Sequence, residues 1–239
     1  MKEIPKLKKN IILGVLFFLP VVFVFIMTIS KENYEPLDIV KTDIKDFLVV
    51  KEDSIKLKGH LTVLAFFGKH PKEKSTEALN LKEIIYDKFK GFKKFQVVGI
   101  ITKGAENEAE ALYKEIASYE DLRFWHFVAL EAHDINRVFK SLKRNFDLSD
   151  NLSSSNLFVI DTDLSQRGRK DAREDDEKAK NKPIYEMNFY NALEVAELRN
   201  ILAAEDLRVL FTEYRQKRKG EFNSDKRRSQ EIQITDETE

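Results

Sequence analysis

The chain contains no cysteine, and this absence excludes several classes of chemistry. Without a thiol there is no disulfide, no thiol catalysis, no Cys-x-x-Cys redox centre and no cysteine-ligated metal site. Histidine is also scarce, since the chain has only His60, His70, His126 and His133. Any imidazole-based metal site must draw on these four side chains.

A net charge of either sign is missing as well. Lys+Arg and Asp+Glu both number 41 in 239 residues, so the formal charge is zero and no basic field exists to hold nucleic acid. The sequence also lacks a glycine-rich phosphate loop and a Gly-x-Ser-x-Gly nucleophile elbow. We therefore expect no nucleic-acid partner, no cofactor and no enzymatic activity.

One long apolar run lies near the amino terminus. Residues 11–29, IILGVLFFLPVVFVFIMTI, carry no charge and approach the ~20 residues that a membrane-spanning helix needs. We therefore expect a single transmembrane helix at 11–29 that contacts the lipid of the inner membrane. The alternative is a cleaved signal peptide ending near Ser30, but the run is longer than the usual signal core of about 7–15 residues.

The charges before this run predict its orientation. Lysines outnumber acids there, with only Glu3 opposing Lys2, Lys6, Lys8 and Lys9. Because basic flanks stay on the cytoplasmic side, we expect residues 1–10 in the cytoplasm and the rest of the chain in the periplasm.

Beyond a linker expected at 30–41, strand and helix patterns alternate and predict one domain over 42–217. Buried-strand patterns occur at 61–67, 95–101 and 157–160, a more exposed strand is expected at 124–130, and a hairpin partner is expected at 183–187. Helical spacing of apolar residues occurs at 75–90, 105–119, 134–142 and 193–217, with a break expected at 203–206. This order predicts an α/β fold, a thioredoxin-like mixed sheet flanked by helices.

Two charged segments lack large apolar residues. We expect residues 168–182 to form a solvated loop and residues 218–239 to form a disordered polar tail. The acidic cluster Glu174–Glu177 lies among basic residues, so it is either self-neutralising or a docking loop for a charged partner.

Several stretches, taken in order, resemble the SCO/SenC family, the membrane-anchored thioredoxin-like proteins that serve cytochrome c oxidase assembly. They are KGHLTVLAFFGKHP (58–71), VVGIITKGAENEAEALYKEIASY (97–119), FWHFVAL (124–130), NLFVIDTD (156–163) and RGRKDAREDD (167–176). The last stretch and the final helix are similar to Bacteroidetes-type members. The resemblance implies a membrane-anchored accessory protein of respiratory oxidase assembly.

The chain departs from this family at its copper site. The family motif is Cys-Pro-x-x-Cys with a distal histidine; here its cysteines fall on His70 and Lys74, and its histidine falls near Ser153. Thiolates select Cu(I) because they are soft, whereas a lysine ammonium repels a metal ion. The departure favours a non-redox scaffold that acts by binding.

His70 and His60 remain weak candidates for metal ligands. Imidazole binds Cu(II) or Zn, but His70 stands among Lys69, Lys72 and Lys74, which disfavours a cation. The alternatives to the scaffold are therefore a copper-handling protein using these histidines and an envelope interaction module unrelated to respiration.

The remaining polar candidates have simpler explanations. Asp161 and Asp163 follow a strand, where a turn explains them better than a cation site does. His126 and His133 have apolar neighbours, which favours core packing or surface pairing.

Overall fold

The computed structural model describes residues 6–29, 36–47, 55–118 and 120–219. The chain divides into two units, Met1–Glu35 and Pro36–Glu239. In the first unit, helix α1 (Lys6–Ile29) covers the predicted apolar segment, and its described large apolar side chains are exposed. Among the helices of the described residues, none satisfies the length and hydropathy expected of a membrane span, so the predicted crossing at 11–29 is not confirmed.

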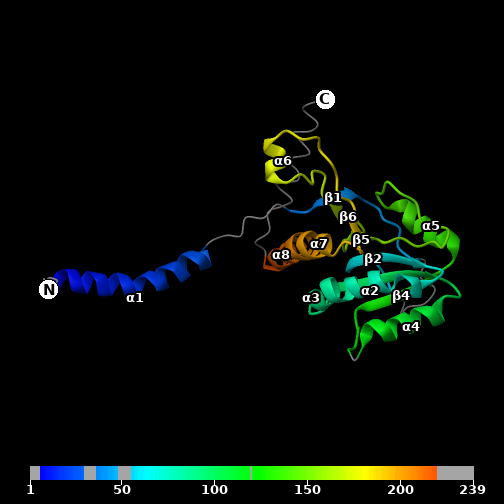
Figure 1. Cartoon of the computed structure of the whole chain (residues 1–239), viewed down its shortest axis with the longest axis horizontal. Coiled ribbons are helices and arrows are strands. Elements are labelled where there is room, and N and C mark those ends of the chain that lie inside the picture. The colour runs from blue at the N-terminus through cyan, green and yellow to red at the C-terminus, as the bar shows by residue number, and fades with distance from the viewer. Residues whose placement is uncertain (1–5, 30–35, 48–54, 119, 220–239) are drawn as a thin grey trace. The chain divides into compact units, whose positions relative to one another are not determined.

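A mixed sheet forms the centre of the second unit (Figure 1). Its strand order among the described residues is β1-β6-β5-β2-β3-β4, and β7 pairs with β5. The strands are β1 (Asp38–Lys41), β2 (Leu61–Gly68), β3 (Phe95–Thr102), β4 (Trp125–Leu130), β5 (Asn156–Ile160), β6 (Gln166–Gly168) and β7 (Tyr190–Asn191). β2, β3 and β4 are parallel, whereas β5 runs antiparallel to β2, and this is the predicted thioredoxin-like arrangement.

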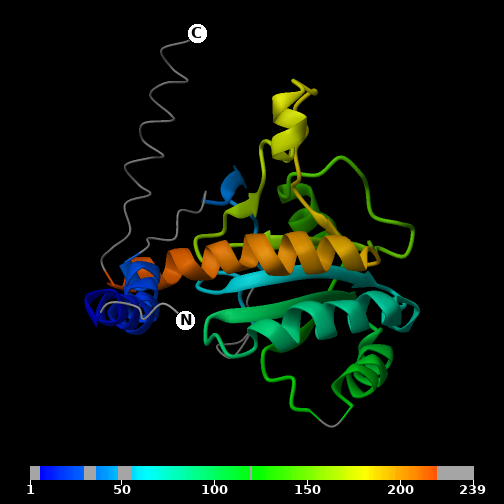
Figure 2. The ribbon, with the colours of Figure 1, turned by 60° about the vertical axis from the view of Figure 1, so that its left-hand side comes forward.

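Helical segments cover both faces of the sheet. They are η1 (Pro71–Lys74), α2 (Ser75–Asn80), η2 (Leu81–Tyr86), α3 (Asp87–Phe89), α4 (Glu106–Ala117), α5 (Ala132–Ser141), α6 (Asp175–Ala179), α7 (Val195–Glu197), η3 (Leu198–Asp206) and α8 (Leu207–Lys219). The helices predicted at 75–90, 134–142 and 193–217 are thus confirmed, with η2 and η3 π-helical. The helix predicted at 105–119 is confirmed over 106–117, and position 119 lies outside the described residues. The run from α7 to α8 lies beside the run from α2 to α3 (Figure 2), where Lys88 donates to the carbonyl of Ala203.

The continuous apolar sequence of β2 follows from burial on both faces. Successive side chains of a strand point to opposite sides, so β2 contributes to two cores. Val63 and Phe67 pack in the core beneath α2–α3, α4 and α8. Leu64 and Phe66 pack in the core beneath α5. A strand covered in this way needs no polar residues, which is why the sequence pattern predicted it.

The predicted hairpin partner of β5 was wrong. The partner is β6, which follows β5 after the turn at Asp161–Ser165, while Met187 of the predicted segment 183–187 makes only an isolated bridge with Arg169. The sequence did not predict β6, because Gln-Arg-Gly shows no apolar pattern although all three residues are buried. The predicted linker 30–41 also needs correction, because β1 at 38–41 pairs with β6.

The charged segment 168–182 is not a loop throughout. It contains α6, whose first turn is closed by a reciprocal capping box between Glu174 and Glu177. Ion pairs of Lys180 with Asp176 and of Lys182 with Glu177 agree with the self-neutralising interpretation. Of the tail predicted at 218–239, residues 220–239 lie outside the described residues, and 218–219 complete α8.

Gly68→Ala is expected to destabilise the fold by about 2–4 kcal/mol. Gly68 has a φ of +68°, and a Cβ there would collide with the carbonyl oxygen of Asn151. Gly104→Ala is the matched control: its φ is +97°, but the added Cβ meets no atom within 4 Å, so it costs about 1 kcal/mol. Urea unfolding of the full chain in nonionic detergent measures both, and equal losses would contradict the steric argument.

Candidate functional site

The segment after β2 carries His70 and Lys74, and only Lys74 of these two enters a partly buried polar cluster. Lys74, at the end of η1, donates to the Glu77 carboxylate at 2.8 Å and to the Ser155 hydroxyl at 3.0 Å. Ser155 in turn donates to the same Glu77 oxygen at 2.8 Å. We call these three residues the Lys74 triad. It places an ion pair, not thiolates, at the carboxyl end of β2.

The sheet explains why residues 81 positions apart in sequence meet in the triad. β5 runs antiparallel to β2, so Ser155, just before β5, lies beside the end of β2. Two backbone contacts secure this junction: Ser154 donates to the carbonyl of Phe66 and Lys69 donates to the carbonyl of Asn151. The sequence placed the distal position near Ser153, in the run of serines 153–155. Ser155 of that run contacts Lys74, whereas the Ser153 hydroxyl bonds with Ser149.

Electrostatics favour the ionised form of the Glu77 carboxyl. Burial alone raises the pKa of the Glu77 carboxyl, but hydrogen bonds from Lys74 and Ser155 outweigh it and hold that pKa below its ordinary value of 4.5. The side chains of Lys74 and Glu77 are only 22% and 10% exposed, so the pair is shielded from solvent. An ammonium group offers no lone pair to a metal, and Lys74 is already paired with the Glu77 carboxylate.

The two metal candidates lie at opposite ends of β2. His60 precedes the strand and His70 follows it, so the strand's eight residues separate them by roughly 25 Å at ~3.3 Å per residue. His70 is about half exposed, and its Nδ1 lies 3.4 Å from a Glu108 carboxylate oxygen of α4. Within the described residues, no cluster of three or more potential metal ligands occurs.

The other two histidines also separate. His133 is exposed and its Nε2 lies 3.3 Å from the Asp134 carboxylate, as surface pairing predicts. His126 is half-buried near the start of β4, and it lines the same cavity as His60.

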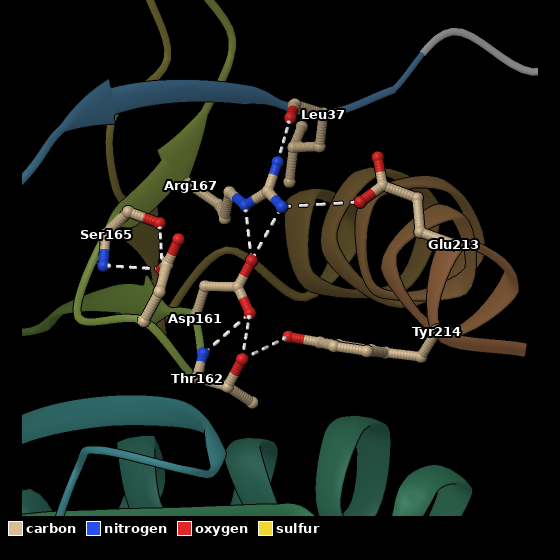
Figure 3. Close-up of polar contacts among 8 residues, drawn as sticks. Leu37, Asp161, Thr162, Ser165, Arg167, Glu213 and Tyr214 are labelled. Atoms are coloured by element: carbon tan, nitrogen blue, oxygen red, sulfur yellow. Dashed lines mark hydrogen bonds and ion pairs between the residues drawn. The ribbon is translucent and has the colours of Figure 1, made fainter. Parts of the chain in front are cut away.

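A second polar centre is built on Arg167 of β6 (Figure 3). Arg167 is only 1% exposed. Its Nε and Nη2 atoms lie 2.7 and 2.6 Å from the same carboxylate oxygen of Asp161. It also donates to the Leu37 carbonyl at 2.6 Å and to Glu213 of α8 at 3.3 Å. We call these residues the Arg167 centre.

Neighbouring hydrogen bonds complete the Arg167 centre. The Asp161 carboxylate accepts from the backbone N–H of Thr162 at 2.6 Å, and the Thr162 hydroxyl lies 3.3 Å from the Tyr214 hydroxyl. Asp163 accepts from the backbone and hydroxyl of Ser165 and so closes the turn. The predicted turn role is confirmed for both residues, because the Asp161 backbone bonds with Leu164 and Ser165. Asp161 is in addition the partner of Arg167, which no local pattern indicated.

Arg169 forms a related pair beside this centre. It donates to Asp206 of η3 at 2.6 Å, and Asp206 also accepts from the buried Tyr190 hydroxyl. Burial raises the pKa of Asp206 despite the lowering effect of Arg169, and burial beside Asp206 raises the pKa of Tyr190. The break predicted at 203–206 is therefore a buried polar contact within a continuous helical run.

Replacing Arg167 with methionine is expected to cost about 3–5 kcal/mol, because Asp161 and Glu213 then remain buried without the guanidinium. Arg123→Met is the control, since that side chain is 75% exposed and pairs only at 3.8 Å; we expect a change within ~0.5 kcal/mol. Chemical unfolding of the full chain compares them, and equal stabilities of the two variants would refute the structural role.

Lys74→Met is expected to lower stability by about 1–2 kcal/mol at pH 7, whereas exposed Lys72→Met leaves it unchanged. Because the folded-state pKa of Glu77 is depressed, the pair stabilises the fold above the ordinary value of 4.5 and is lost as the pH falls through the folded value. The stability gap to wild type should therefore shrink on acidification. Unfolding midpoints from pH 7 to 3 test this, and a constant gap would rule out the ion pair as its source.

Comparison with known proteins returns structural neighbours only. No family model and no curated protein matches the chain. The soluble domain of Sco1 from Bacillus subtilis is 14% identical with a TM-score of 0.38, covering 71% of this chain and 91% of that one. A putative thiol:disulfide interchange protein DsbE from Chlorobium tepidum is 14% identical with a TM-score of 0.38, covering 70% and 98%. A putative protein disulfide isomerase from Bacteroides thetaiotaomicron is 14% identical with a TM-score of 0.37, covering 70% and 95%. The thioredoxin-like fold rests on the strand order of this chain, and no activity is transferred from these proteins.

Proposed function

We propose that this chain is a membrane-anchored, non-redox accessory protein related to the SCO/SenC family, which acts by binding a protein partner in respiratory cytochrome oxidase assembly. The observation that carries the proposal is the Lys74 triad. The place where the family holds thiolates is occupied by a neutralised lysine, and the chain has no cysteine elsewhere. Binding is the function that such a site retains.

The anchor and orientation are part of the proposal. Residues 11–29 carry no charge, α1 is helical across them, and its described apolar side chains from Ile12 to Phe25 are exposed. Contact with inner-membrane lipid would cover this apolar surface. The preceding lysines favour a cytoplasmic amino terminus and a periplasmic domain.

The geometry does not favour the copper-handling alternative. That alternative needs His70 and His60 in one site, yet they flank β2 at its two ends and His70 contacts a carboxylate of α4. The envelope-module alternative shares the binding mechanism and differs only in its partner. Partner identity therefore separates the two binding hypotheses, and metal stoichiometry tests the third.

Site-specific photo-crosslinking in intact membranes tests the partner. With a photoreactive residue at the exposed position Lys72, two residues from the triad, we expect capture of a respiratory oxidase subunit. The same residue at exposed Lys140 on α5 is the matched control and should capture that subunit much less. Capture of only non-respiratory envelope proteins would support the envelope module, and capture of no partner would refute the binding role.

Metal titration provides the complementary test. The purified full chain should bind neither Cu(II) nor Zn(II) stoichiometrically, and His70→Ala should leave its metal content unchanged. One tightly held ion per chain that disappears in His70→Ala would overturn the non-metal proposal and restore the copper-handling alternative.

A further inference from the structure

A cavity of about 250 Å³ opens at the amino-terminal ends of β2, β3 and β4. Five basic residues line it, with Phe124 among the apolar groups: Lys56, Lys58, His60, Lys93 and His126. This end of the sheet is opposite the Lys74 triad, so the cavity plays no part in the function proposed above.

The parallel strands explain why these residues converge. Residues at the starts of adjacent parallel strands share one edge of the sheet, and Leu61 of β2 pairs with Phe95 of β3. His60 immediately precedes β2, Lys93 lies two residues before β3, and His126 is the second residue of β4. Three separate chain segments thus supply one basic edge.

The charge in this cavity is one-sided. None of its lining residues is acidic, and none of its three lysines forms an ion pair with a residue that the structure describes. Some other lysines of the domain, such as Lys74, Lys90 and Lys103, do contact a carboxylate. The lining residues of the cavity therefore carry positive charge, which favours an anion over a metal cation.

His60 supplies hydrogen-bonding capacity that the described protein groups leave unused. The Nδ1 atom of His60 is buried, and no group in the described part of the chain hydrogen-bonds to it. Buried polar atoms are seldom left unpaired, so a ligand oxygen at this point would satisfy it. Burial, followed by the charge of His60, lowers the pKa of His126, as expected where cations gather without a carboxylate.

We propose that this cavity binds a small organic phosphate, a monoester whose phosphoryl oxygens meet the lysines and histidines and whose carbon skeleton lies against Phe124. Lysine ammonium groups act as point charges for phosphate, and imidazole N–H groups add directed hydrogen bonds. The volume suits a ligand smaller than a typical drug-sized molecule.

Phenyl phosphate is the probe, and phenol, which keeps the ring without the charge, is the ligand control. Calorimetric titration of the full chain in nonionic detergent should give saturable one-site binding of phenyl phosphate, while phenol shows none. Imidazole resonances of His60 and His126 should shift with the same saturation curve, and those of His70 and His133 should not.

Two double variants locate the site. Replacing Lys56 and Lys93 with glutamine should weaken phenyl phosphate binding about tenfold or more, because charge-assisted contacts are lost. Replacing exposed Lys72 and Lys114, which lie outside the cavity, with glutamine removes the same charge and should leave affinity within about twofold. If both double variants lost affinity for phenyl phosphate equally, the binding would depend only on the net charge of the protein, and the proposal would be overturned.

A third ligand distinguishes the source of the phosphate. Glycerophosphoglycerol is the headgroup of phosphatidylglycerol without acyl chains and carries a phosphodiester. We expect phenyl phosphate to bind at least tenfold more tightly, because a monoester carries more negative charge near neutral pH. Preference for the diester would assign the cavity to a lipid headgroup, and no saturable binding of either would refute the site; neither result bears on partner capture.

Discussion

The buried guanidinium of Arg167 constrains the whole second unit. Taking a charged group out of water costs several kcal/mol, so Arg167 is tolerated only when every neighbour is in place. Those neighbours are the Asp161 carboxylate at the end of β5, the Leu37 carbonyl before β1, and Glu213 on α8. Because they come from segments far apart in the chain, the ion pair joins the sheet edge to the final helix and specifies one docking arrangement.

The elements that the sequence predicted are buried by apolar contacts, whereas those it missed are buried by polar contacts or are very short. β2 and β3 are apolar on both faces, and α4 and α5 carry apolar stripes, so hydrophobic pattern alone predicted them. β6 is equally buried, but its burial is satisfied by polar partners, and polarity hides such a strand from a hydrophobicity pattern. β1 was assigned to the linker because a four-residue strand has too few positions to show a period.

The residues of the candidate site were likewise predicted only in part. The sequence correctly placed His70 and Lys74 on the loop after β2, since a glycine and a proline follow the apolar run there. It did not identify Glu77 and Ser155 as partners of Lys74, because antiparallel pairing of β5 with β2 creates that contact. The sequence suggested His70, the nearest histidine along the chain, as the metal-site partner of His60. Parallel pairing instead brings the starts of β2 and β4 to one edge of the sheet, so His60 lies near His126.

The two ends of β2 therefore differ in a way that has chemical consequences. At the carboxyl end, a lysine is held by a carboxylate and a hydroxyl, so its charge is balanced by that carboxylate. At the amino end, lysines and histidines surround a cavity without an acidic lining residue. A balanced surface suits recognition by shape and hydrogen bonding, as a protein partner requires. An unbalanced cavity suits capture of a small anion, so one fold carries two surfaces that are separable by mutation.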